Sequence, residues 1–303
     1  TSSDRIFFSL TRSAAIGVLV LLGGIIVSLI IGAWPAIEKF GFSFLWTRRW
    51  APQLDEPVLG ALAPLYGTLL SSIIAMLIAV PFGMGIAIFL TELCPIPLRR
   101  PIGTAIELLA GIPSIIYGMW GFFVLAPFMT DHFMPAVIAS FQHVPVLNVI
   151  FAGPPSYLSL FNASLVLAIM ILPFITAISR DVFQTVPPML KESAYGLGCT
   201  TWEVVKNVVI PFTRAGVIGG IMLALGRALG ETMAVTLVIG DTAGKINTSL
   251  FDSSKTISAL LADQFGSPTN DMHLSALYYA AFLLLLTVNA IQAWQLRYAD
   301  RGR

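Results

Sequence analysis

Six long apolar stretches, separated by segments that carry nearly all of the charge, set the hydrophobic pattern of this chain. Each stretch is close to the roughly 20 residues that a helix needs to cross the hydrocarbon core of a bilayer. The pattern therefore predicts an all-α polytopic membrane protein with six transmembrane helices. Their expected positions are 14–33, 65–90, 102–126, 163–179, 215–239 and 275–294.

The composition agrees with a membrane protein. Hydrophobic residues make up 56% of the chain and charged residues 11%, whereas soluble domains carry about 25% charged residues. The mean hydropathy is +0.85. The net charge of +1 gives no reason to expect a nucleic-acid partner. No metal site is expected, because the three histidines are scattered without ligand spacing. Cys94 and Cys199 fall in segments expected to face the cytoplasm, where a disulfide is not expected.

The distribution of lysine and arginine predicts the orientation. Of the 17 such residues, eleven fall before the first stretch, between the second and third, between the fourth and fifth, and after the sixth, and five fall in the opposite loops. Cytoplasmic loops carry the excess of these residues, so both termini are expected in the cytoplasm. The first apolar stretch is longer than the usual 7–15 residues of a signal peptide, which favours a retained anchor.

Arg227 lies inside the fifth apolar stretch, about 20 Å beyond Arg214 along a helix that rises 1.5 Å per residue. A charge in the hydrocarbon core costs at least a few kcal/mol and indicates a function. Glu231 follows at i+4 on the same helix face and is the expected partner. The two residues form either a structural ion pair or part of an anion pathway, which we favour. A guanidinium suits a tetrahedral oxyanion because its fork is planar and its charge is permanent.

A break in the third stretch adds to the predicted pathway. The residues Gly-Ile-Pro-Ser at 111–114 interrupt the apolar run, and such breaks are tolerated where the backbone lines a cavity or is buried in protein. An ordinary proline kink is the alternative. Arg180 is a second basic position at the inner end of the fourth stretch, although anchoring explains it equally well. The segment 128–162 is expected to form an interfacial cap outside. The expected pathway residues are Arg227, Glu231, Thr232, Arg180 and Ser114.

The segment between the fourth and fifth stretches predicts a short helix on the inner face. The hydroxyl of Thr200 is expected to cap this helix, with Glu203 in its first turn, and Pro211 is expected to end it. A short helix bounded by prolines and rich in small residues suits docking into a groove of another protein. A helix on the membrane surface is the alternative, but few basic residues line it.

This segment resembles the EAA loop of ABC importer permeases. The resemblance rests on Glu192-Ser193-Ala194 with Gly198, followed by Ile210-Pro211, and Ser193 stands where the family usually has alanine. The longer motifs 110–121, 191–196 and 226–235 resemble the PstC-type permeases of bacterial phosphate importers, and this resemblance covers nearly the whole chain. It implies that the loop couples to an ATPase. The coupling residues it implies are Glu192, Ser193, Ala194, Gly198, Thr200, Thr201, Trp202, Glu203 and Pro211.

The resemblance also implies an architecture and partners. It implies the type I ABC importer permease fold in the bacterial inner (plasma) membrane. The parts would be an N-terminal segment at 1–63, a permease domain at 64–296 with a coupling loop at about 181–214, and a cytoplasmic tail at 297–303. The implied partners are a second homologous permease in a heterodimer, two ATP-binding subunits that hold ATP and Mg, and a periplasmic phosphate-binding protein. The chain itself would bind no cofactor and catalyse no reaction.

The source of energy is expected outside this chain. The segment 240–246 has three residues between its glycines and no serine or threonine after Lys245, so it does not match a phosphate-binding nucleotide loop. The energy must then come from another subunit or from a gradient. With the resemblance, we expect the permease subunit of an ATP-driven importer of inorganic phosphate. Two alternatives remain: a secondary anion transporter driven by an ion gradient, and a membrane scaffold that signals phosphate status.

Overall fold

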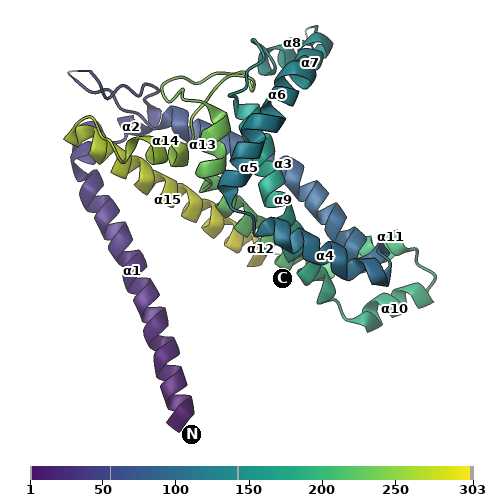
Figure 1. Ribbon diagram of the computed structural model, residues 1–303. Helices are drawn as coiled ribbons and strands as arrows, with labels where there is room; N and C mark the ends of the chain where they lie inside the picture. Colours follow the sequence, from purple (N-terminus) through teal and green to yellow (C-terminus); the bar gives the residue numbers. More distant parts are fainter. Residues whose placement is uncertain (1, 55, 142, 301–303) are drawn as a thin grey trace.

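The computed structural model describes residues 2–54, 56–141 and 143–300 and is built from helices (Figure 1). Among these residues, six helical stretches are long and apolar enough to cross a membrane, which confirms the predicted number of spans. They are Asp4–Phe40, Leu62–Leu93, Ser114–Phe141, Leu160–Gln184, Thr201–Leu229 and Asp271–Ala293.

Long helices and short connecting helices alternate along the chain. The long ones are α1 (Ser2–Phe40), α3 (Leu62–Ile88), α9 (Leu160–Gln184), α12 (Ile210–Leu229) and α15 (Asp271–Asp300). The third span combines α5 (Ser114–Trp120), α6 (Ala126–Phe128) and α7 (Met134–Phe141) with π-helical turns at Gly121–Leu125 and Met129–Phe133. The connecting helices are α2 (Ser43–Trp46), α4 (Ile96–Ala110), α8 (Pro145–Ile150), α10 (Pro188–Gly196), α11 (Thr201–Val204), α13 (Met233–Ile239) and α14 (Ile257–Gln264). Two more π-helical turns, Phe89–Leu93 and Val205–Val209, follow α3 and join α11 to α12.

The connecting helices gather at the two ends of the spans. In Figure 1, α2, α8 and α14 lie at the upper end, and α10 and α11 lie at the lower end. The amino-terminal end of α1 also lies below, so it is on the same side as α10. We call these two ends the α14 side and the α10 side.

The third span lies later in the chain than predicted. It runs over Ser114–Phe141 rather than 102–126. Pro113 has no N–H and disfavours helix in the residue before it, so the helix ends at Ala110 and restarts at Ser114. Residues 96–110 instead form the separate helix α4. The predicted outer cap at 128–162 is therefore wrong as far as Phe141, because those residues belong to the span.

The fifth span is also displaced, from 215–239 to Thr201–Leu229. The prediction that Pro211 ends a separate short helix is wrong, because α11, the turn Val205–Val209 and α12 run on without a gap. The N–H of Ile210 reaches back five residues to the carbonyl of Val205. This π-helical turn lies directly before Pro211, where proline cannot donate the regular helical hydrogen bond.

Glycines let neighbouring helices approach α9, the most enclosed of the spans. A Cβ atom on Gly83, Gly121 or Gly220 would lie 2.9, 2.3 or 2.5 Å from a methyl group of a β-branched side chain of α9. Those methyl groups belong to Ile175, Val166 and Ile178. Small residues in membrane helices allow such close contact between backbones. The bundle is therefore centred on α9, with α3, α12 and the third span around it.

The first helix meets the bundle only through its carboxyl-terminal part. Figure 1 shows α1 extending away from the other helices, beside α15 at its upper end only. The N–H of Ala36 donates to Oγ of Ser275 at 2.9 Å, and Gly32 packs against the ring of Tyr278. At the other end of the chain, α15 continues through most of the predicted tail 297–303 as far as Asp300. Residues 301–303 lie outside the described residues.

Substitution of Gly118 by valine is expected to destabilise the bundle. A Cβ atom at Gly118 would lie 2.8 Å from Cα of Ala234, so α5 and α13 would have to separate. Overpacking of this kind costs about 1–3 kcal/mol. Gly85→Val is the matched control, since nothing lies within 4 Å of a Cβ there. Thermal unfolding in detergent should show a lower midpoint for Gly118→Val alone, and equal midpoints would contradict the packing of α5 on α13.

Candidate functional site

Arg227 occupies the last turn of α12 and is exposed in the single chain. Its guanidinium carbon lies 5.6 Å from the centre of the Phe174 ring on α9, a cation–π arrangement. Its charge also acts on the hydroxyl group of Tyr117 on α5. No ion pair holds Arg227 among the described residues. The arginine is therefore a cation that lies over the Phe174 ring and is open to a ligand.

The expected ion pair between Arg227 and Glu231 is not formed. The i+4 argument assumed one continuous helix, but α12 ends at Leu229 and α13 begins at Met233. Oε1 of Glu231 instead accepts the backbone N–H of Ala234 at 3.2 Å, so this carboxylate caps α13. No ion pair between Glu231 and Arg227 is present in the described part of the chain. The structural alternative for Arg227, a pair with Glu231, is wrong for this chain.

The two chain breaks of the candidate pathway lie at the starts of helices that pack on each other. Ser114 is the first residue of α5, and Thr232 directly precedes α13. The hydroxyl of Thr232 donates to the carbonyl of Gly230 at 3.3 Å. Because Gly118 packs on Ala234, α5 and α13 lie side by side. Four of the five predicted pathway residues thus belong to α5, α12 and the link to α13.

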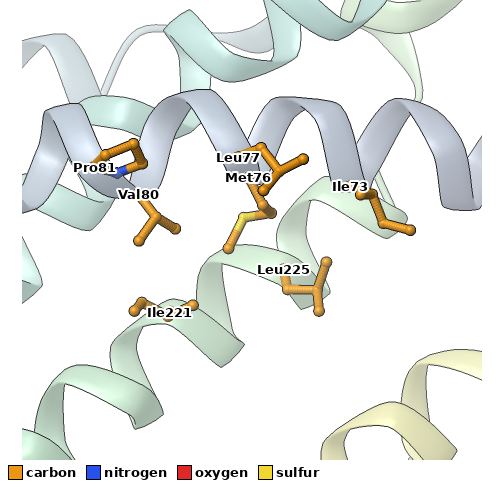
Figure 2. A pocket seen from close by; sticks show the side chains of 7 residues that line it. All are labelled: Ile73, Met76, Leu77, Val80, Pro81, Ile221 and Leu225. Atoms are coloured by element: carbon orange, nitrogen blue, oxygen red, sulfur yellow. The ribbon is translucent and has the colours of Figure 1, made fainter.

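An apolar groove runs between α3 and the helix that carries Arg227. Figure 2 shows Met76 pointing from α3 toward α12 and Leu225 on the facing helix. The cavity has a volume of about 480 Å³. Its lining is Ile73, Met76, Leu77, Val80, Pro81, Ile221 and Leu225. No polar side chain lines the groove, so it cannot bind an anion. The next polar side chain along α12 is Arg227, two residues after Leu225.

Arg180, the fifth predicted pathway residue, lies elsewhere. Its guanidinium binds two carboxylates, Glu107 on α4 at 2.6 Å and Asp181 at 2.8 Å. Gly103 makes room for it, because a Cβ there would lie 2.6 Å from Nη1 of Arg180. The arrangement ties α4 to the end of α9. Two carboxylates already neutralise this cation, so any contact with a passing anion would compete with them.

The motif Glu192-Ser193-Ala194 lies on α10, a short helix at one end of the bundle (Figure 1). Ala194 faces inward and packs in a cluster with Phe183 and Val209, while Glu192 and Ser193 are exposed. Nζ of Lys191 pairs with Glu92 at 2.5 Å, and the side chain of Glu92 is only 6% exposed. The helix is therefore held to the end of α3 by a largely buried ion pair and to the start of α12 by packing.

The predicted cap after α10 is confirmed. The hydroxyl of Thr200 accepts the N–H of Glu203, and the carboxylate of Glu203 accepts the N–H of Thr200 at 2.7 Å, which makes a capping box. Gly198 has a φ of +85°, a left-handed backbone that favours glycine. Thr201 opens α11, and Trp202 is 64% exposed. The loop thus presents a fixed, partly apolar surface on the α10 side.

Sequence reasoning did not assign three residues of these sites: Tyr117, Phe174 and Glu92. Tyr117 belongs to one of the quoted motifs, but an aromatic residue in an apolar stretch carries no separate signal. Glu92 is a carboxylate at the end of the second apolar stretch, 99 positions before Lys191. Among the described residues no three His, Cys, Asp or Glu side chains gather to hold a metal ion, and both cysteines are free.

The arrangement of the helices is shared with a solved transporter. One chain of the crystal structure of a bacterial alginate ABC transporter, in complex with an alginate pentasaccharide-bound periplasmic protein, aligns with a TM-score of 0.64 at 15% identity. The alignment covers 99% of this chain and 96% of that chain. The chain therefore has the type I ABC importer permease fold.

The sequence comparisons give the family. Residues 79–303 match the family described as binding-protein-dependent transport system inner membrane component, and the chain belongs to this family of multi-pass inner membrane proteins. The phosphate transport system permease protein PstC of Mesorhizobium japonicum is 59% identical over 96% of this chain and 88% of its own length. The protein of the same name from Pasteurella multocida is 52% identical over 95% of this chain and 89% of its own length.

Proposed function

We propose that this chain is the membrane-spanning permease subunit of an ATP-driven importer that moves inorganic phosphate across the inner membrane. The observation that carries the proposal is the guanidinium of Arg227, which is exposed and has no carboxylate partner among the described residues. A permanent cation at a helix break within the membrane domain attracts an oxyanion. The name of the relatives, phosphate transport system permease protein, supports phosphate as that oxyanion.

Arg227 is exposed in a single chain, so another protein surface must face it to complete the pathway. We assign that surface to a second, homologous permease subunit, which would form a heterodimer with this chain. An arginine exposed to lipid would cost several kcal/mol, whereas the same side chain facing a polar interface is stabilised. Glu231, Thr232 and Ser114 belong to the neighbouring helix starts and would supply polar contacts beside the arginine.

The α10 side is assigned to the cytoplasm, with both termini there, and the binding of two ATPase subunits is assigned to α10 and the loop after it. The exposed apolar side chains of this surface support docking to a protein groove. They are Met189, Tyr195, Leu197 and Trp202. ATP and Mg would be held by the ATPase subunits and not by this chain. A periplasmic phosphate-binding protein would deliver phosphate to the α14 side.

Transport by the reconstituted complex tests the proposal. This chain, its partner permease and the ATPase are co-purified and placed in liposomes, and uptake of radioactive phosphate is measured with the external binding protein. We expect uptake that requires both ATP and the binding protein. Uptake driven by an ion gradient without ATP would identify a secondary transporter. An assembled complex without any uptake would favour a signalling scaffold, and either result would overturn the proposal.

A further inference from the structure

A polar cavity of about 360 Å³ opens on the α14 side, between the segment after α2 and the segment after α13. The two segments touch, because a Cβ on Gly244 would lie 3.3 Å from the backbone nitrogen of Trp50. This contact brings Arg49 and Lys245, which are 196 positions apart in the sequence, to the same cavity. The cavity is lined by the segment after α2 and by Gln264 of α14, and both helices lie at the opposite end of the bundle from α10 (Figure 1).

Gln264 presents a free amide donor to this cavity. Its Oε1 accepts the indole N–H of Trp50 at 2.9 Å and also contacts Nε2 of His273 at 3.0 Å. Nδ1 of His273 accepts the N–H of Thr269, so the ring proton lies on Nε2 and also points to Oε1. Two donors thus fix the orientation of the amide. The NH₂ group of Gln264 has no acceptor among the described residues, and Gln264 lines the cavity.

The two cations of the cavity are also free. Arg49 and Lys245 are exposed and make no ion pair or hydrogen bond within the described part of the chain. The guanidinium, the ammonium and the amide NH₂ thus bring three kinds of unpaired donor to one polar cavity, whose lining also includes Gln53, Asp241 and Thr242. Such a set suits an oxyanion, since each donor can bond an oxygen and the two cations balance its charge.

The one carboxylate in the lining, Asp241, already has a cationic partner. Asp241 pairs at 3.0 Å with Nζ of Lys255, a side chain that is only 2% exposed and that also binds Asp263. The buried lysine is therefore shared by two carboxylates. Arg49, Lys245 and Lys255 bring three positive charges to this cavity, and Asp241 and Asp263 bring two negative ones. The carboxylates are both committed to Lys255, which leaves Arg49 and Lys245 to an incoming ligand.

We propose that this cavity, formed by Arg49, Lys245 and Gln264, is a second oxyanion site that receives inorganic phosphate before it reaches Arg227. The identity of the oxyanion rests on the proposed function, whereas the site itself rests on the unpaired donors. The site takes one tetrahedral oxyanion from outside the membrane.

Equilibrium binding of radioactive phosphate to the assembled complex tests this site. All variants carry Arg227→Gln and are measured without binding protein, so that neither the inner arginine nor the external protein contributes. We expect saturable binding of one phosphate per permease. Arg49→Gln with Lys245→Gln should weaken it at least tenfold, and Arg48→Gln, an exposed neighbour that does not line the cavity, should leave it unchanged.

Gln264→Glu is the second variant. A glutamate oxygen still accepts the donors of Trp50 and His273, so the local fold is kept, while the free donor becomes a carboxylate. We expect at least a tenfold loss of phosphate binding with an unchanged unfolding temperature. Absence of saturable binding in the Arg227→Gln complex, or unchanged affinity in the Arg49 and Lys245 double variant, would overturn the site.

Docking of the external binding protein, measured beside phosphate binding, distinguishes a phosphate site from a protein contact. If the cavity instead receives an acidic side chain of that protein, the double variant will lose docking but keep its phosphate affinity, which overturns the proposal. If the unmodified complex transports phosphate and the cavity binds none, only the second site fails. If the unmodified complex does not transport phosphate, the proposed function fails, and the binding assay still reports on the cavity.

Discussion

Replacement of Arg227 by glutamine is expected to lower phosphate uptake about tenfold to a hundredfold while the complex still assembles. Glutamine keeps hydrogen-bonding ability but removes the charge. Hydrogen bonds to charged groups contribute roughly 1.5–3 kcal/mol, and 1.4 kcal/mol corresponds to about a factor of ten. Folding should be little affected, because Arg227 has no ion-pair partner to leave stranded in the described chain. Uptake is measured in liposomes and normalised to the assembled complex.

Three further variants sharpen this test. Arg227→Lys keeps the charge and should retain more uptake than Arg227→Gln. Arg214→Gln removes an exposed arginine from the opposite end of the same helix and should transport normally. Adding Glu231→Gln to Arg227→Gln should not restore uptake, because Glu231 caps α13 and does not pair with Arg227. Near-normal uptake in Arg227→Gln would exclude Arg227 from the anion pathway.

Reversal of the charge on Lys191 is expected to uncouple ATP hydrolysis from transport. In Lys191→Glu two carboxylates would meet at a largely buried position, and breaking such a pair costs about 3–5 kcal/mol. The helix α10 would then lose its bond to the end of α3. We expect at least a tenfold loss of phosphate moved per ATP hydrolysed in the assembled complex. That ratio does not change if the mutation only lowers the amount of folded protein.

The double variant Lys191→Glu with Glu92→Lys restores an ion pair with its ends exchanged, and we expect it to recover most of the coupling. Lys206→Glu is the control, since Lys206 is exposed near the same surface and makes no ion pair among the described residues. Equal losses in Lys206→Glu and Lys191→Glu would show that the charge of the surface matters and not the bond to Glu92. If the double variant does not recover coupling, the ion pair between Lys191 and Glu92 is not what couples ATP hydrolysis to transport.

Hydropathy was sufficient to predict the number of spans, because crossing a membrane depends on local composition. It was insufficient for the third and fifth spans, where the position of a helix break decides the boundary. Proline alone does not locate such a break: Pro35, Pro81 and Pro173 all lie inside helices. Pro113 coincides with a break, whereas Pro211 follows a π-helical turn that carries the helix through.

In the candidate site too, features set by neighbouring residues in the sequence could be predicted, and features set by contacts between distant residues could not. A lone arginine in an apolar stretch identified Arg227, and the spacing of Thr200 and Glu203 predicted a capping box that the structure confirms. The predicted pairing of Arg227 with Glu231 was wrong, because residues four apart share a helix face only while the helix continues. Phe174 and Glu92 depend on contacts between distant parts of the chain, and no spacing in one sequence predicts them.

The π-helical turn Val205–Val209 has a consequence for the direction in which Arg227 faces. A π-helical turn holds one residue more than an α-helical turn. Each residue of a helix adds about 100° of rotation and 1.5 Å of rise. Converting this one turn to regular α-helix would therefore swing all of α12 around its axis by about a quarter of a circle, while α10 and α11 stay in place. A small change of hydrogen bonding in this one turn, next to the inner surface, would therefore change the direction in which the Arg227 side chain points from α12.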